Sequence, residues 1–189
     1  MPARLVVLAS GSGTTLQAIL DDRELRPYVV AVGADRPDCT ALGRAAAAGV
    51  DAFVVPFAQY PDRGEWNRDF EKTLAERAPD LVVLAGFMRI LDAQVVERFP
   101  MVNTHPSLLP AFPGVGIRAV RAALAAGVPA AGATVHRVDA GVDTGEILAQ
   151  VEVPVQPGDD EHSLFARIQA AEKPLYVETL RRLVQQIPS

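Results

Sequence analysis

The sequence has little with which to build covalent crosslinks or a metal centre. Its 189 residues include one cysteine, Cys39, and three histidines, His105, His136 and His162. A single cysteine excludes an intramolecular disulfide and a cysteine cluster for a metal. The histidines form no HxH or HExxH arrangement, so no metal site is predicted. We therefore expect a chain without a bound metal that suits a reducing compartment.

Long apolar runs and an excess of positive charge are also missing. The first apolar run, Leu5 to Ala9, is too short for the core of a signal peptide, and no run approaches the length that spans a bilayer. A formal net charge of −5 and a pI near 5.2 argue against broad attraction to nucleic acid or an anionic membrane. We expect a cytoplasmic protein with no nucleic acid or membrane partner, in which any phosphate is bound locally.

Aromatic residues make up only 6% of a chain that is 49% hydrophobic. This balance, rich in Ala, Val and Leu, favours a parallel sheet covered by helices over a β-sandwich. Short β-branched runs alternate with segments at helical spacing, which is typical of βαβ units. The predicted fold class is α/β: a three-layer, Rossmann-like, mostly parallel sheet with helices on both faces and an antiparallel C-terminal part. The length fits one domain over residues 1–189.

The predicted elements follow one another with short connections. Strands are predicted at Leu5–Ala9, Tyr28–Gly33, Ala52–Val55, Leu81–Ala85, Met101–His105, Thr134–Val138 and Ile147–Val153. Helices are predicted after Thr14, at Thr40–Ala48 and Gly64–Arg77, near Arg118–Ala126, and from about Glu161 to Gln186. The last two strands are expected to be antiparallel around the loop 139–145. Trp66, Phe70 and Leu74, at four-residue steps, are predicted core residues.

Three polar residues are candidates for chemistry. Asn103 and His105 share one face of a strand that ends at His105, and ligands of open α/β sheets bind at such carboxyl ends. A carboxylate is needed nearby if His105 is to act as a cation, and Asp143 is the candidate, with Asp139 as its competitor. An amide, an imidazole and a carboxylate can hold a carbonyl oxygen and move a proton, which predicts acyl transfer. A hydrogen-bonded core histidine and an Asx turn are the alternative interpretation.

Three further residues are considered beside this set. Pro106 prevents regular ladder pairing after His105. His136 faces the same side as Thr134 and either lines the pocket or bonds to the main chain. His162 opens the last helix and is expected at the surface.

A glycine-rich loop between the first strand and the first helix is a candidate phosphate site. Main-chain N–H groups and the helix dipole favour an anion there. Spacing excludes a Walker loop, and Leu16 stands where the dinucleotide pattern needs a third glycine. A plain helix N-terminal turn stays open as the alternative. The predicted phosphate residues are Gly11, Ser12, Gly13, Thr14 and Thr15.

Taken in order, several motifs resemble the phosphoribosylglycinamide formyltransferase family over nearly the whole chain. The matching segments are SGSGTTLQ at Ser10–Gln17, LAGFMRIL at Leu84–Leu91, NTHPSLLP at Asn103–Pro110, the strand Thr134–His136, VDTG at Val142–Gly145, and Glu172. The departures from the family's pattern are Thr15 in place of asparagine, Thr104 in place of an apolar residue, the sequence around Lys173, and a loop at 113–118 that lacks the usual histidine.

The resemblance implies transfer of a formyl group from 10-formyltetrahydrofolate, as co-substrate, to the amine of glycinamide ribonucleotide (GAR) in purine synthesis. It implies catalysis by Asn103, His105 and Asp143. It implies binding of the GAR phosphate and ribose by Gly11 to Thr15 and Glu172. The folate residues that it implies are Phe87, Met88, Arg89, Ile90, Leu91, Asn103, Ala140, Gly141, Val142 and Asp143, with His136 and Pro106 also in the pocket. Phosphate binding is expected in the half 1–100, and folate binding and catalysis in the half 101–189.

The same polar set occurs in relatives with other activities. Formyltetrahydrofolate deformylase, a hydrolase, and methionyl-tRNA formyltransferase carry additional domains, and a sequence of 189 residues is expected to hold neither. A non-catalytic folate or nucleotide binder is the third alternative. A homodimer stays open, and the loop 139–145 is hypothesised to close over folate.

Overall fold

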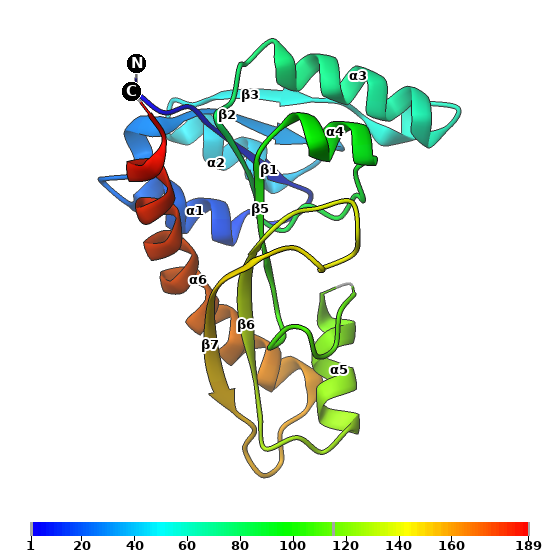
Figure 1. Cartoon of the computed structure of the whole chain (residues 1–189), viewed down its shortest axis with the longest axis vertical. Helices are drawn as coiled ribbons and strands as arrows, with labels where there is room; N and C mark the ends of the chain where they lie inside the picture. The colour runs from blue at the N-terminus through cyan, green and yellow to red at the C-terminus, as the bar shows by residue number, and fades with distance from the viewer. Residues whose placement is uncertain (1, 115, 189) are drawn as a thin grey trace.

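One mixed sheet organises the molecule (Figure 1). The computed structural model describes residues 2–114 and 116–188, and in this part seven strands form a sheet in the order β3-β2-β1-β4-β5-β6-β7. Strands β1 to β5 pair in parallel, whereas β6 is antiparallel to β5 and β7 is antiparallel to β6. The strands are β1 Leu5–Ala9, β2 Val29–Ala34, β3 Asp51–Val54, β4 Leu81–Leu84, β5 Met101–His105, β6 Ala130–Arg137 and β7 Ile147–Pro154. The predicted fold class is confirmed.

Helices follow most of the strands. They are α1 Thr14–Asp21, α2 Thr40–Ala47, α3 Arg63–Ala75, α4 Ala93–Arg98, α5 Ile117–Ala125 and α6 Glu161–Gln186, with short 3-10 turns at Arg26–Tyr28 and Phe57–Gln59. Helix α4 was not predicted, because six residues are too few to show a helical period. Within residues 2–114 and 116–188, no helix combines the length and apolarity that crossing a membrane requires.

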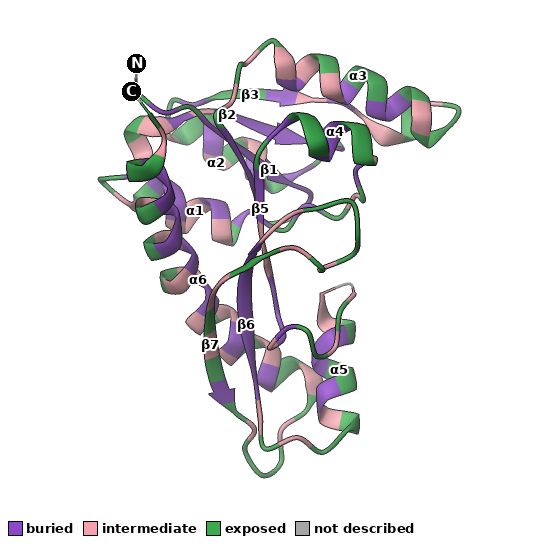
Figure 2. Cartoon of the chain, viewed as in Figure 1, coloured by how far each residue is buried: buried purple, intermediate pink, exposed green. Residues whose placement is uncertain are grey.

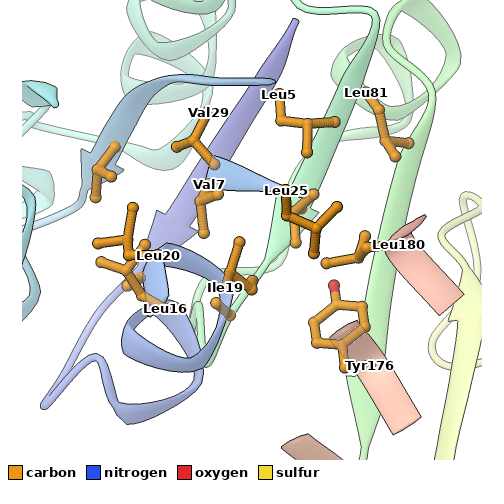
Figure 3. Packing of buried hydrophobic residues seen from close by; sticks show 14 of the residues in the cluster. Leu5, Val7, Leu16, Ile19, Leu20, Leu25, Val29, Leu81, Tyr176 and Leu180 are labelled. Atoms are coloured by element: carbon orange, nitrogen blue, oxygen red, sulfur yellow. The ribbon is translucent and has the colours of Figure 1, made fainter. Parts of the chain in front are cut away.

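The alternation of side chains along β1 assigns the helices to two faces of the sheet. Leu5, Val7 and Ala9 belong to a buried cluster with α1, α2 and the second half of α6 (Figure 3). Val6 and Leu8 point the other way, into a cluster with α3 and α4. The three-layer prediction therefore holds, and the central strands β1 and β4 are buried on both sides, whereas the edge strand β7 is largely exposed (Figure 2).

The aromatic core under α3 reaches the predicted folate segment. Trp66, Phe70 and Leu74 are fully buried, as predicted. The Trp66 ring stacks on Phe70 with 4.7 Å between centroids, and the Phe70 ring lies 5.5 Å from that of Phe87. These ring contacts pack Phe87, which lies in the segment after β4, against helix α3.

The edge of the sheet has a step where β5 ends. His105 pairs with Thr134 of β6, but Ala130 to Ala133 continue past it and pair only with β7. The predicted start of β6 at Thr134 was therefore four residues late, because the run Ala-Ala-Gly-Ala carries no β-branched residue. Helix α5 and the first half of α6 pack on this extension. The segment after β5 lies beside this extension, where Thr134 Oγ1 donates to Ser107 O and accepts from Leu109 N.

Candidate active site

A cavity of about 230 Å³ lies at the carboxyl end of β5. It is bounded by the end of β5, the segment after β4, the loop after β6 and one face of α6. Of the predicted site residues, it is lined by Thr15, Phe87, Met88, Arg89, Ile90, Leu91, Asn103, His105, Pro106, His136, Ala140, Gly141, Val142, Asp143 and Glu172. Gly11, Ser12, Gly13 and Thr14 lie outside this lining. In the loop 113–118, Gly114 and Gly116 line the cavity, and Val115 lies outside the described residues.

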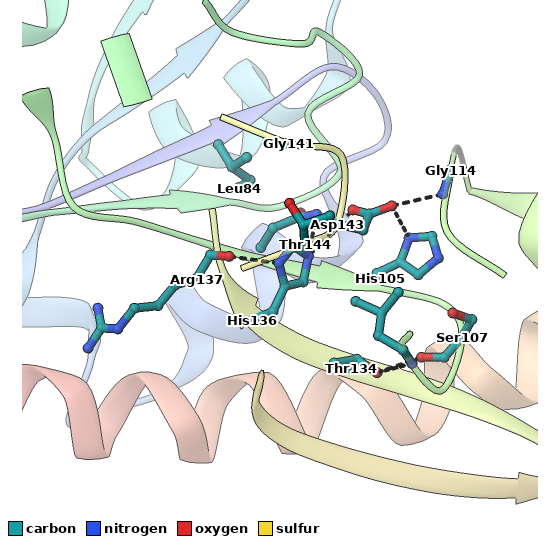
Figure 4. Close-up of polar contacts among 12 residues, drawn as sticks. Leu84, His105, Ser107, Gly114, Thr134, His136, Arg137, Gly141, Asp143 and Thr144 are labelled. Carbon is teal, nitrogen blue, oxygen red and sulfur yellow. Dashed lines mark hydrogen bonds and ion pairs between the residues drawn. The ribbon is translucent and has the colours of Figure 1, made fainter. Parts of the chain in front are cut away.

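The loop after β6 separates the two candidate carboxylates. Asp139 Oδ1 accepts hydrogen bonds from Gly141 N at 3.1 Å and from Thr144 Oγ1 at 2.7 Å. Asp139 therefore forms an Asx turn with its own loop. Asp143 has a positive φ of 55°, in the left-handed region that non-glycine residues rarely adopt. This conformation turns its carboxylate inward (Figure 4). Of the two, Asp143 is the carboxylate placed beside the histidines.

His105 lies between two oxygen atoms. Its Nδ1 is 3.5 Å from Asp143 Oδ2, and its Nε2 is 2.9 Å from the carbonyl oxygen of Phe112. Gly114 N donates to the same Asp143 oxygen at 2.8 Å. Since both ring nitrogens face acceptors, only the doubly protonated ring offers a proton to each. The ring of His105 is therefore held between the Asp143 carboxylate and the Phe112 carbonyl.

His136 has the opposite arrangement. Its Nδ1 donates to the carbonyl oxygen of Arg137 at 2.8 Å, which leaves Nε2 as the acceptor. Burial lowers the pKa of His136, so the ring is neutral at pH 7. Asn103 Nδ2 lies 3.4 Å from this acceptor, and Asp143 Oδ1 is 3.5 Å from it. His136 thus lines the cavity and also bonds to the main chain, and it turns the nitrogen of the Asn103 amide toward itself.

The predicted phosphate loop joins β1 to α1. Gly13, with φ 69°, is the N-terminal cap of α1 and gives no side-chain cap to the first turn. Free N–H groups at a helix start favour an anion. Thr15 joins this loop to the cavity.

Glu172 faces the cavity from α6. It is only 8% exposed, and burial raises its pKa to about 7, against a smaller lowering by Lys173. Phe165 and Gln169 line the same wall. The sequence reasoning missed these two residues, although their spacing from Glu172 on a predicted helix places all three on one face.

The segment after β4 is held at two points. Met88 N donates to Ser10 Oγ at 2.9 Å. The Arg89 side chain pairs with Asp35 through a 2.6 Å contact between Nε and Oδ2, and its guanidinium lies 4.1 Å from the centre of the Phe57 ring. Asp35 is buried. It is not among the predicted site residues, although an acidic residue just after a predicted strand is a usable signal of a ligand site. The charge of Arg89 is therefore already paired.

A mostly parallel sheet that carries an amide, an imidazole and a buried carboxylate around a cavity at its carboxyl edge defines an α/β enzyme for a small ligand. The family follows from comparison with known proteins. Residues 3–180 match the formyl transferase family, and the chain belongs to it.

Individual members of the family are similar to this chain over most of their length. The chain is 52% identical over 186 residues to phosphoribosylglycinamide formyltransferase of Mycobacterium tuberculosis, covering 96% of this chain and 85% of the relative. It is 38% identical over 177 residues to the Escherichia coli enzyme of that name, covering 91% and 82%. The crystal structure of glycinamide ribonucleotide transformylase 1 from Symbiobacterium toebii superposes with a TM-score of 0.91 at 44% identity, covering 100% of this chain and 91% of that one. The predicted family is confirmed.

Proposed function

We propose that this chain transfers the formyl group of 10-formyltetrahydrofolate to the amine of GAR, giving formyl-GAR and tetrahydrofolate in purine synthesis. The observation that carries the proposal is the inward carboxylate of Asp143, 3.5 Å from His105 and from His136, in a cavity that also holds Asn103. The relatives with this name support the choice of substrates. The proposal includes a cytoplasmic location and small molecules as the partners.

The chemistry begins with attack of the amine nitrogen on the formyl carbon. A carbon–nitrogen bond forms, and the formyl oxygen becomes an oxyanion on a tetrahedral carbon. Asn103 and the protonated His105 supply hydrogen bonds to that oxygen. Because Nε2 of His105 bonds to Phe112 O in this structure, the ring must exchange that partner for the oxyanion.

The reaction ends when the bond from the formyl carbon to the folate nitrogen breaks. The amine must lose a proton and the folate nitrogen must gain one, so the net change is a proton transfer between them. Asp143 is the base that stands beside His105, and it also stabilises the imidazolium while the oxyanion exists. No redox partner is required.

We assign the two substrates to two different parts of the site, which meet at Thr15 in the cavity. The loop from Gly11 to Thr15 takes the phosphate of GAR, and Glu172 accepts from its ribose hydroxyls. The segment from Phe87 to Leu91 and the loop from Ala140 to Asp143 take the folate. Met88 and Ile90 are 60% and 58% exposed, so a planar ring that packs on them removes apolar surface from water.

The test is to supply 10-formyltetrahydrofolate with and without GAR and to follow folate absorbance. Turnover that requires GAR and yields formyl-GAR supports the proposal. Turnover without an acceptor indicates the hydrolase instead. Tight folate binding with no turnover indicates a binding protein, and either of these two results overturns the proposal.

A further inference from the structure

The phosphate loop is held from behind by α2. Ala41 N donates to Gly11 O at 3.2 Å, and the Cys39 thiol lies 3.2 Å from the same oxygen. Arg44 Nε donates to Ser12 O at 2.7 Å. The carbonyl groups of two successive loop residues are therefore bound by the second helix.

Close packing fixes the loop in this position. A Cβ atom built on Gly13 would lie 2.8 Å from both Cα and Cβ of Ala41 and 3.2 Å from Cδ of Arg44. When carbonyl groups turn toward α2, the N–H groups of the loop and of the first turn of α1 are left for an anion. The anion-binding shape of the loop is thus set by α2 and not by α1 alone.

Arg44 also brings a positive charge to the loop. The segment from Ser10 to Thr15 contains no charged side chain, and the whole chain has a net charge of −5. The second contact of Arg44, from Nη1 to Gln17 Oε1 at 2.9 Å, holds its guanidinium against α1, and Gln17 Nε2 in turn donates to Asp21 Oδ1 at 2.8 Å. A phosphate group bound at the loop gains from a fixed cation nearby even without direct contact.

We propose that Arg44 is a positioning residue for the phosphate of the acceptor substrate. It holds the carbonyl of Ser12 away from the anion, bridges α2 to α1 through Gln17, and supplies a cation behind the loop. This inference rests on the proposed function, because that function places the acceptor phosphate at the loop.

The experiment compares Arg44→Ala and Arg44→Lys with Arg26→Ala as the matched control. Arg26 donates from Nη2 to Ala48 O at 2.5 Å, so it also binds the main chain next to α2 but at the end away from the loop. We expect Arg44→Ala to raise the KM for GAR about tenfold or more, with kcat and the KM for folate within about twofold. Arg44→Lys keeps the charge and should lie between Arg44→Ala and the wild type, whereas Arg26→Ala should leave all three constants unchanged. A KM for GAR within twofold of wild type in Arg44→Ala overturns the inference, and so does an equal rise in Arg26→Ala.

Direct binding separates this inference from the proposed function. Titration calorimetry with GAR, with its dephosphorylated nucleoside and with inorganic phosphate is run on the wild type and Arg44→Ala, after circular dichroism shows that both are folded. If the wild type binds GAR and the nucleoside equally, the phosphate does not use the loop and the inference fails while formyl transfer stands. If formyl transfer is absent but inorganic phosphate binds the wild type and not Arg44→Ala, the proposed function fails and the role of Arg44 stands.

Discussion

At the scale of single residues, the proposed chemistry depends most directly on Asp143. Asparagine in its place can still accept the hydrogen bond from Gly114 N, but it carries no charge to stabilise His105 and cannot take a proton. We expect Asp143→Asn to lower kcat by about 100-fold or more, with the circular dichroism spectrum and folate binding kept. Asp139→Asn is the control, because an amide oxygen can still accept the hydrogen bond from Gly141 N. Near-normal turnover in Asp143→Asn would remove this residue from the mechanism.

Glu172 makes stability depend on pH. Burial raises its folded-state pKa from 4.5 to about 7, so between these values the folded protein holds a proton that the unfolded chain has lost. Stability therefore falls as pH rises from 4.5 to 7, and the full penalty is present above 7. We expect Glu172→Gln to stabilise the protein at pH 8 by up to about 3 kcal/mol and to have no effect below pH 4.

Thermal unfolding at a series of pH values measures this difference, with Glu178→Gln, an exposed position on the same helix, as the control. Because the ionised form of Glu172 is the one that accepts hydroxyl protons, the KM for GAR should fall in the wild type as pH rises through 7. Equal melting curves for wild type and Glu172→Gln at pH 8 would contradict the assignment.

The sequence predicted which polar residues meet, but not every contact between them. Asn103 and His105 could be placed on one strand face from spacing alone, and the glycines around Asp143 indicated a turn that brings it inward. The contacts of His136 with Asn103 and Asp143 depend on the register of β5 against β6, which the sequence does not specify. The pairing of Asp35 with Arg89 likewise depends on β2 and β4 lying on either side of β1 in the folded sheet.

At the scale of elements, the connection from β1 to α1 is the most constrained. Gly13 has a positive φ, and a methyl group there would collide with the main chain of α2 at Ala41. We expect Gly13→Ala to destabilise the protein by about 1 kcal/mol or more and to raise the KM for GAR, because the loop must move. Gly11→Ala is a matched control for stability, since a Cβ at Gly11 meets nothing within 4 Å. Denaturant unfolding and acceptor kinetics on both variants provide the measurement, and equal stability would show that the loop can adapt.

Element boundaries were predicted well where periodicity is strong and poorly where it is weak. The 26 residues of α6 and the five of β5 have the predicted bounds, because a long amphipathic pattern and a proline stop mark them. The start of β6 and the whole of α4 escaped prediction. In those segments tertiary pairing and packing, rather than local pattern, decide the structure.

At the scale of the whole molecule, α6 joins parts of the core that are far apart. Its second half packs with β1 and α1, and its first half packs with α5 and β6. The Tyr176 hydroxyl lies 3.1 Å from Leu84 O and 3.0 Å from Val102 O, which ties this helix to β4 and β5. We propose that the chain unfolds as one cooperative unit.

The single tryptophan gives a direct test of that cooperativity. Trp66 is a fully buried residue of α3, on the face of the sheet opposite to the second half of α6. We expect its fluorescence and the far-ultraviolet circular dichroism to show the same denaturant midpoint. Trp66→Phe supplies the fluorescence baseline. Two separated midpoints would show that the α3 side unfolds independently of α6.

Ser10 links the proposed phosphate loop to the proposed folate segment through two hydrogen bonds. Its N–H donates to Gly86 O at 3.1 Å, and its hydroxyl accepts from Met88 N. Ser10 directly precedes the phosphate loop, and it is bonded to the turn at which the folate segment begins. A ligand that shifts either side must shift or strain the other. Thermodynamic reciprocity then applies: the factor by which one substrate changes the affinity for its companion is the same in both directions. Affinities measured for each substrate alone therefore do not multiply to give the stability of the ternary complex.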